Sequence, residues 1–184
     1  MRCFLSIDIE ENLKNRVLEI QKKIGNLNAN IKFVEPENLH FTIKFIGEVN
    51  ENEVDEIKKS LRFCLKNEAA FKIKICGIGY FGKPNYLRTL WLGIKEGESE
   101  LSELIKYVNV NIKFGKDEET PHLTIGRIKT GKNRQDLLNF LDENKNVNIG
   151  EMNVNEVKLK ASILTKSGPI YKDLEIFKLG CENE

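Results

Sequence analysis

Histidine and cysteine are both scarce in this chain of 184 residues, which contains two of the former and four of the latter. No two cysteines form a C-x-x-C pair; they are Cys3, Cys64, Cys76 and Cys181. This spacing excludes the usual cysteine-based zinc and redox motifs. We therefore expect buried or incidental thiols in a reducing compartment.

An excess of charge of one sign is also absent. The chain has 29 Lys and Arg against 28 Asp and Glu, a formal net charge of +1. Proteins that bind duplex DNA usually carry an excess of positive charge. This chain lacks that excess, so any nucleic-acid contact here needs a local basic patch. No apolar run reaches membrane length, and the N-terminal MRCFLSIDIE has a charge at Asp8 in place of a signal-peptide core. We expect a soluble, cytoplasmic protein with no membrane partner.

Strand and helix patterns alternate along the chain. β-rich stretches predict strands at 2–9, 31–34, 39–46, 71–78, 87–94 and 121–128, and two more between 154 and 179. Helical spacing of apolar residues predicts helices at 11–24, 50–66, 98–112 and 133–144. The stretch GYFGKPNY is read as a loop. Hairpin-length links and helical crossovers predict an α+β fold, and without a flexible linker residues 1–184 form one domain.

Both histidines lie in the same local setting. The stretch ENLHFTIKFIG contains His40 and the stretch PHLTIGR contains His122; in each, an apolar residue, a Thr and another apolar residue follow the His. Because alternate side chains of a strand share a face, His40 lies beside Thr42. His122 lies beside Thr124 in the same manner. The motifs are 82 positions apart, which suggests two similar lobes facing each other across a cleft.

Two imidazoles and two hydroxyls across one cleft suit hydrolysis of a phosphoester. A neutral imidazole can take a proton from water, an imidazolium can protonate the departing oxygen, and Thr hydroxyls can bind the other phosphoryl oxygens. Two structural histidines are the alternative. With six Thr in the chain, however, the repeated spacing is roughly a one-in-a-thousand coincidence. Two distant His without a Cys pair or H-E-x-x-H make a poor zinc site, so we expect no metal and no cofactor.

These stretches resemble the paired His-x-Thr signatures of the two-histidine (2H) phosphoesterase superfamily, in its 2′-5′ RNA ligase-like or RNA 2′,3′-cyclic phosphodiesterase branch. The resemblance continues through RCFLSIDI, LRTLWLGI and LTKSGPIYKDLEIFKL. It implies a bilobal, pseudo-symmetric α+β fold, with two antiparallel sheets flanked by helices around a central cleft. It also implies metal-independent hydrolysis of a terminal RNA 2′,3′-cyclic phosphate to a 2′-phosphomonoester. Ligation of tRNA halves through 2′-5′ linkages is the reversible side of that chemistry.

The resemblance also assigns roles to residues. His40 is the proton donor to the leaving 3′-oxygen and His122 is the base that activates water, an order that the nearly symmetric motifs alone leave open. Thr42 and Thr124 hold the phosphate. Arg127 also binds phosphate.

Five side chains near the motifs have open or conditional roles. Phe45 could stack on a base, but strand parity turns both it and Arg127 away from the His face, so both roles need a bulge after the Thr. Lys44 shares the His face by parity and could meet RNA phosphates or be a solvated rim residue. Arg88 could line the cleft, and Tyr171 could reach the substrate.

Other functions remain to be weighed. The same chemistry could act on small cyclic nucleotides, or the chain could be an RNA- or nucleotide-binding module without catalysis. Binding alone does not demand two imidazoles, which argues against the module. The stretch GYFGKPNYLR mixes aromatic rings with Lys83 and Arg88, and it could either hold an RNA backbone or cover the edge of the core. We expect a monomer.

Overall fold

The computed structural model describes residues 1–118, 120–166 and 168–180. The elements follow one another as β1 (Arg2–Asp8), α1 (Glu11–Gly25), β2 (Ile31–Phe33), a 3-10 turn (Pro36–Asn38), β3 (His40–Glu48), α2 (Glu51–Leu65), β4 (Phe71–Lys83), β5 (Tyr86–Glu96), α3 (Glu98–Asn111), β6 (Lys116–Asp117), β7 (Leu123–Ile128), α4 (Arg134–Glu143), β8 (Asn148–Val154), β9 (Glu156–Leu164) and β10 (Pro169–Lys178). Within these residues, no helix is both long and apolar enough to cross a membrane.

The strands form one antiparallel sheet of two halves, which meet between β3 and β7. Its order is β10-β9-β1-β3-β7-β5-β4-β8, with β2 beside β7 and β6 beside β3. In the ladder between β3 and β7, the facing residues are Phe41 and Leu123. Along this order, four antiparallel strands lie on each side of the junction, and β6 and β2 add one short strand to each half. The predicted α+β class with two antiparallel halves is confirmed, and the halves are continuous through their two innermost strands.

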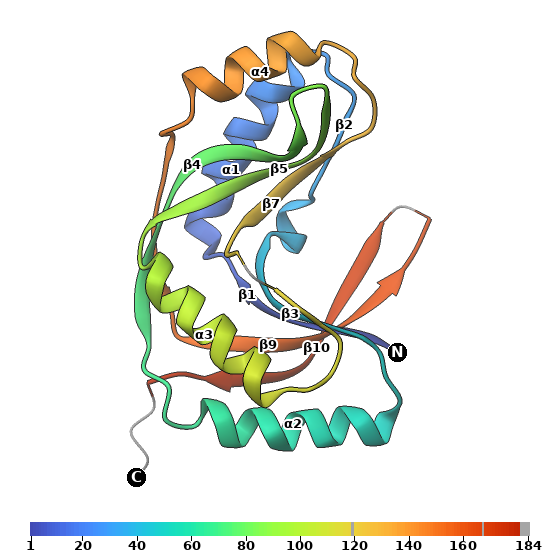
Figure 1. The fold of residues 1–184 in the computed structure, drawn as a ribbon, viewed down its shortest axis with the longest axis vertical. Helices are drawn as coiled ribbons and strands as arrows, with labels where there is room; N and C mark the ends of the chain where they lie inside the picture. Colours follow the sequence, from blue (N-terminus) through green and yellow to red (C-terminus); the bar gives the residue numbers. More distant parts are fainter. Residues whose placement is uncertain (119, 167, 181–184) are drawn as a thin grey trace.

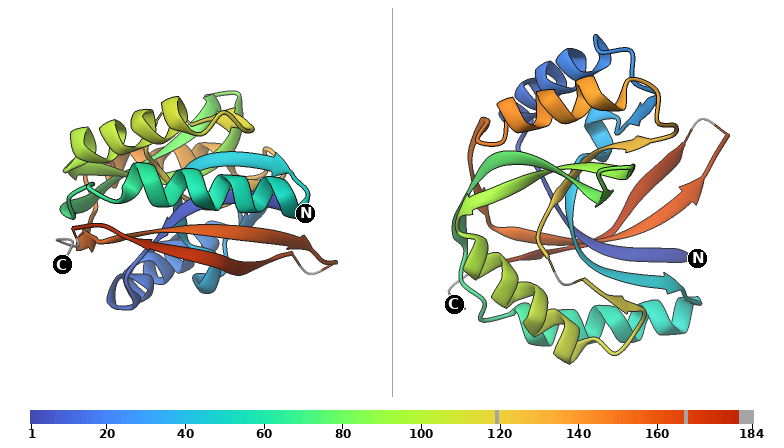
Figure 2. Two further views of the ribbon diagram at one scale, coloured as in Figure 1. Left: turned by 90° about the horizontal axis from the view of Figure 1, so that it is seen from below. Right: turned by 45° about the horizontal axis from the view of Figure 1, so that its top comes forward.

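The helices cover the two ends of the sheet. α1 packs against β7 and β8, and α4 lies at the same end of the molecule (Figure 1). α2 contacts α3 and β10 at the other end, and the views of Figure 2 show the long β9–β10 hairpin beside the N-terminal strand. α2 begins with a capping box, in which Asn50 and Glu53 each accept the other's backbone N–H. Its apolar positions Val54, Ile57 and Leu61 are buried, as the helical spacing predicts.

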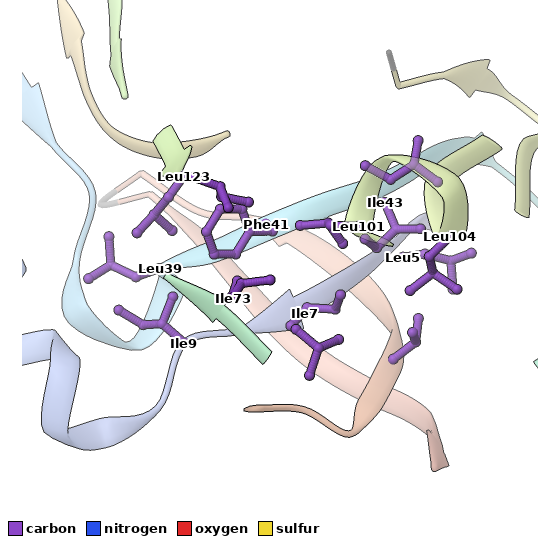
Figure 3. Packing of buried hydrophobic residues seen from close by; sticks show 14 of the residues in the cluster. Leu5, Ile7, Ile9, Leu39, Phe41, Ile43, Ile73, Leu101, Leu104 and Leu123 are labelled. Atoms are coloured by element: carbon purple, nitrogen blue, oxygen red, sulfur yellow. The ribbon is translucent and has the colours of Figure 1, made fainter. Parts of the chain in front are cut away.

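The core fills the space between sheet and helices, and it includes the apolar residues of the first motif strand. Leu39, Phe41 and Ile43 are almost completely buried. Figure 3 shows Phe41 between Leu123 and Ile73, with the α3 residues Leu101 and Leu104 farther along the strand. This packing fixes one face of β3, so that the alternate residues face away from the core.

The stretch predicted as a loop, 79–86, is a β-hairpin. β4 continues to Lys83 and β5 begins at Tyr86, so the turn contains only two residues. Gly79 faces Trp91 across the hairpin, and a Cβ on Gly79 would lie 2.4 Å from the indole ring. The prediction was wrong because this glycine makes room for an aromatic ring on a strand and does not mark a turn.

Two strands were not predicted at all. β6 is only two residues long, and β8 has irregular apolar spacing. The register between β4 and β8 shifts next to Gly150, which has a positive φ of 143°. That irregularity interrupts the alternation of side chains from which a strand is recognised.

The cysteines are free thiols where the structure describes them. Cys3 and Cys64 are buried, as predicted, and Cys76 is half-buried. Burial raises the pKa of the Cys64 thiol to about 11, which keeps it protonated and unreactive. Cys181 lies outside the described residues.

Candidate active site

The two His-x-Thr motifs lie on one cavity of about 510 Å³. β3 supplies His40, and His122 directly precedes β7, the neighbouring strand at the junction. All six predicted site residues line this cavity: His40, Thr42, Phe45, His122, Thr124 and Arg127. The cavity is open to solvent, so a substrate has access to both motifs. We call it the catalytic cavity.

Each imidazole is held by a backbone carbonyl two residues before it. Nδ1 of His40 lies 2.7 Å from the Asn38 carbonyl oxygen, and Nδ1 of His122 lies 2.8 Å from that of Thr120. A carbonyl oxygen can only accept a hydrogen bond, so Nδ1 carries the proton of each neutral ring. Nε2 of each ring is therefore available to take or give a proton. The equivalence of the two motifs thus extends to the tautomer of their histidines.

A β-bulge follows the Thr in β3. Thr42 and Lys44 face consecutive residues of β1, which leaves Ile43 as the extra residue. A bulge reverses the alternation of the side chains beyond it. Phe45 consequently lies on the same side as His40, with 45% of its surface exposed. The bulge that its predicted role requires is present.

The prediction that Lys44 shares the face of the histidine was wrong, because the same bulge turns Lys44 to the opposite side. Lys44 is 1% exposed. Its ammonium group pairs with the Asp117 carboxylate of β6 and donates to Oδ1 of Asn109 in α3, at 3.3 Å. Lys44 therefore ties β6 and α3 to the motif strand and does not face the catalytic cavity.

A second β-bulge follows the Thr in β7. Thr124 and Gly126 face consecutive residues of β5, which leaves Ile125 as the extra residue. Arg127 consequently lines the cavity together with Thr124. Gly126 also lets β2 approach closely, since a Cβ there would lie 2.9 Å from Cγ2 of Ile31. The two bulges occupy equivalent positions, 82 residues apart in the sequence.

Aromatic rings pack against both imidazoles. Tyr171 meets His40 edge-on with 5.5 Å between ring centroids, and Phe4 lies 5.1 Å from it. Phe81 meets His122 edge-on at 4.8 Å. These contacts restrict rotation of the imidazoles, and Tyr171 and Phe81 also line the cavity. Sequence reasoning missed the roles of Phe4 and Phe81, because only the paired strands bring them to the histidines.

The surroundings of His40 favour its neutral form. Burial lowers its pKa below the ordinary value for histidine, against the opposing effects of the hydrogen bond to Asn38 and the negative charge of Asp8. The positive charge of Lys160 lowers the pKa further, and a proton on His122 would act in the same direction. His40 is therefore uncharged near neutral pH in the free site.

A network of charges on β1, β9 and β10 adjoins His40. Asp8 faces His40 in the register of β1 and β3. Its carboxylate accepts hydrogen bonds from Lys160 at 2.8 Å and Lys158 at 3.0 Å, and Asp173 lies 3.3 Å from Lys160. The lysines hold the pKa of the Asp8 carboxyl below its usual value. Asp8 thus remains charged near neutral pH.

Asp8→Asn is expected to lower the pKa of His40 further. The substitution removes a negative charge that favours the imidazolium, while both lysines remain nearby. An NMR titration of the His40 ring measures the shift. Asp55→Asn, on the exposed side of α2, removes the same charge far from the site and is the matched control. An unchanged or raised pKa in a folded Asp8 variant contradicts this account.

The geometry supports acid–base chemistry on a phosphoester. Two histidines, two threonines and Arg127 line the cavity. In the part of the chain that the structure describes, no group of three or more His, Cys, Asp or Glu could hold a metal ion. Fold and motifs together define a two-histidine phosphoesterase architecture.

Comparison with known proteins agrees with this class. The family model of the LigT-like phosphoesterases matches residues 7–91 and 92–171. The chain belongs to this family, and the resemblance inferred from its motifs is confirmed.

Similar proteins cover almost the whole chain. An RNA 2′,3′-cyclic phosphodiesterase of Methanothermobacter thermautotrophicus is 42% identical over 182 residues, which is 97% of this chain and 99% of that protein. The protein of the same name from Methanocaldococcus jannaschii is 40% identical over 176 residues, covering 94% and 97%. A crystal structure from Thermus thermophilus superposes with a TM-score of 0.79 at 27% identity, over 100% of both chains.

Proposed function

We propose that this protein hydrolyses the 2′,3′-cyclic phosphate at the end of an RNA strand to a 2′-phosphomonoester, without a metal ion. One observation carries the proposal: two imidazoles, each fixed through Nδ1 to a carbonyl, line one cavity with a Thr beside each. The names of relatives that are 42% and 40% identical support the choice of an RNA cyclic phosphate as the substrate.

In the proposed reaction the two histidines act on opposite sides of the phosphorus. Nε2 of His122 takes a proton from water as the water oxygen bonds to phosphorus. The bond from phosphorus to O3′ breaks, and Nε2 of His40 donates its proton to O3′. Thr42 and Thr124 donate hydrogen bonds to the non-bridging oxygens, and Arg127 offsets their negative charge. Proton exchange with solvent then restores both rings.

The substrate itself supplies the charge that the proton donor requires. His40 has a lowered pKa in the free site. The bound phosphodiester is an anion, and a nearby anion favours the imidazolium. His40 therefore becomes protonated as substrate binds, and its low intrinsic pKa makes it ready to release the proton to O3′.

The same groups serve ligation if the 5′-hydroxyl of a second RNA replaces water. Its oxygen bonds to phosphorus as O3′ leaves, which forms a 2′-5′ linkage of the kind that would join tRNA halves. Both motifs come from one chain, so we propose that residues 1–184 act as a single domain and as a monomer.

The test is hydrolysis of an oligonucleotide ending in a 2′,3′-cyclic phosphate by the purified protein in excess EDTA. We expect full activity and a terminal 2′-phosphate, identified by phosphorus NMR of the product. Absence of hydrolysis, or loss of hydrolysis in EDTA, would overturn the proposal. A terminal 3′-phosphate would show that O2′ is the leaving oxygen and would refute the bond cleavage described above.

A further inference from the structure

A second cavity, of about 380 Å³, adjoins the catalytic cavity. The two share Thr89, Arg127 and Lys129. The second cavity lies between the start of β5, the end of β7 and the segment that leads into α4. The proposed reaction gives this neighbouring space no role. We call it the basic cavity because of its lining.

The lining of the basic cavity has charge of only one sign. It includes five cations and no acidic residue: Arg88, Arg127, Lys129, Lys132 and Arg134. All five are exposed. The chain as a whole has a net charge of only +1, so this is a local concentration of positive charge. Like charges gathered in a concave surface repel one another and attract anions.

Carboxylates of the described residues do not balance the charge of these cations. Across residues 1–118, 120–166 and 168–180, none of the five forms an ion pair with a carboxylate. Arg134 uses one guanidinium nitrogen, Nη1, to donate to the Asn85 carbonyl at 3.0 Å. That bond fixes the tip of the β4–β5 hairpin to the start of α4. The walls of the basic cavity are thereby held together.

An aromatic ring stands at the same place. Tyr86, the first residue of β5, lines the basic cavity with 68% of its surface exposed. An exposed ring beside cations is the combination with which proteins bind single-stranded nucleic acid, because every base has a face on which to stack. Among the residues that the structure describes, no ion pair accounts for these cations, and the exposed ring of Tyr86 is not part of the core.

An RNA substrate needs a path for the strand that precedes its cyclic phosphate. The cyclic phosphate is on the last nucleotide, so the preceding strand must leave the catalytic cavity through that nucleotide's 5′-phosphate. Arg127 lines both cavities and marks a path between them. A third cavity also meets the catalytic one, but Arg2 and Lys116 are the only cations that it adds, and much of its lining is apolar.

We propose, resting on the function proposed above, that the basic cavity binds the backbone phosphates of the nucleotides immediately 5′ of the cyclic phosphate. Arg88, Lys132 and Arg134 meet the phosphates, and Tyr86 stacks on a base. The preferred substrate is therefore a single-stranded RNA end several nucleotides long. A mononucleotide cyclic phosphate reaches only the catalytic cavity.

The test compares kcat/KM for adenosine 2′,3′-cyclic phosphate with kcat/KM for short oligonucleotides ending in the same group. We expect the oligonucleotides to react with the higher kcat/KM, and this advantage to shrink as salt rises. The slope of log kcat/KM against log salt is negative. In the double variant Arg88→Ala with Lys132→Ala, its magnitude should decrease by about 1.4, for two lost phosphate contacts on a single strand. That is roughly a sevenfold smaller change between about 50 and 200 mM salt.

The matched control is Lys59→Ala with Lys66→Ala. Both lysines are exposed, one on α2 and one just after it, and neither lines a cavity described above. The control changes net charge equally, so it isolates the position of the charge. The basic-cavity proposal is overturned if the two double variants have the same salt dependence of kcat/KM, or if oligonucleotides have no advantage. In either case, hydrolysis by the wild type still supports the proposed function. Failure of the wild type on every substrate defeats the proposed function instead.

Discussion

His122→Ala is expected to lower kcat/KM for a terminal RNA 2′,3′-cyclic phosphate by about 10²- to 10⁴-fold, and His40→Ala by a similar factor. Each imidazole lines the cavity and is held through Nδ1 by a carbonyl, which leaves Nε2 for proton transfer. Because the rings act in the same step, the double variant should be scarcely slower than either single variant. Rates from initial-velocity assays with folded proteins check this. Wild-type rates in either single variant would be incompatible with the mechanism.

The residual activity of the single variants identifies the acid and the base. In His122→Ala the pH profile depends on His40, whose pKa lies below the ordinary histidine value. A proton donor is active when protonated, so the residual kcat/KM, which reports the free enzyme, should be high below that pKa and fall as pH rises through it. A residual rate that instead increases over the same range would make His40 the base. Circular dichroism across the pH range confirms that the variant remains folded.

Phe41→Ala is expected to lower the free energy of unfolding by about 3–5 kcal/mol. Phe41 is 0% exposed and faces Leu123 where the two halves of the sheet meet. Removing the ring leaves a cavity at that junction, which the strands on either side cannot easily close (Figure 3).

Urea denaturation measures the change, and Phe63→Ala is the matched control. Phe63 lies on α2 with 87% of its surface exposed, so its loss should change stability by about 0.5 kcal/mol or less. If the two variants were equally stable, the side chains at the junction of the two halves would not be tightly packed.

The sequence predicts the centre of the site better than its edges. Alternation of side chains holds within each motif, so it correctly places His40 beside Thr42 and His122 beside Thr124. The alternation fails just beyond each Thr, because a β-bulge depends on how two strands pair and not on one strand alone. Nothing within β3 alone indicates that Ile43 is the extra residue.

Residues brought in by other strands could not be assigned from local patterns. Phe4 and Phe81 contact the histidines only through the pairing of β1 and the folding of the β4–β5 hairpin. The balanced composition of the chain does not indicate the basic cavity. The run RIKTGKNR does indicate it, because it contains four of the five cations in its lining. Arg88 joins that run from β5, which no spacing within the sequence reveals.

The junction of the sheet also has a consequence for catalysis. His40 precedes Phe41 and His122 precedes Leu123, so each imidazole is one peptide away from the side chains that separate the two halves. The backbone pairing of β3 with β7 at these two residues therefore sets how far apart the two motifs lie. A substitution that displaces either strand at this pair would shift one imidazole relative to the other, with neither histidine altered.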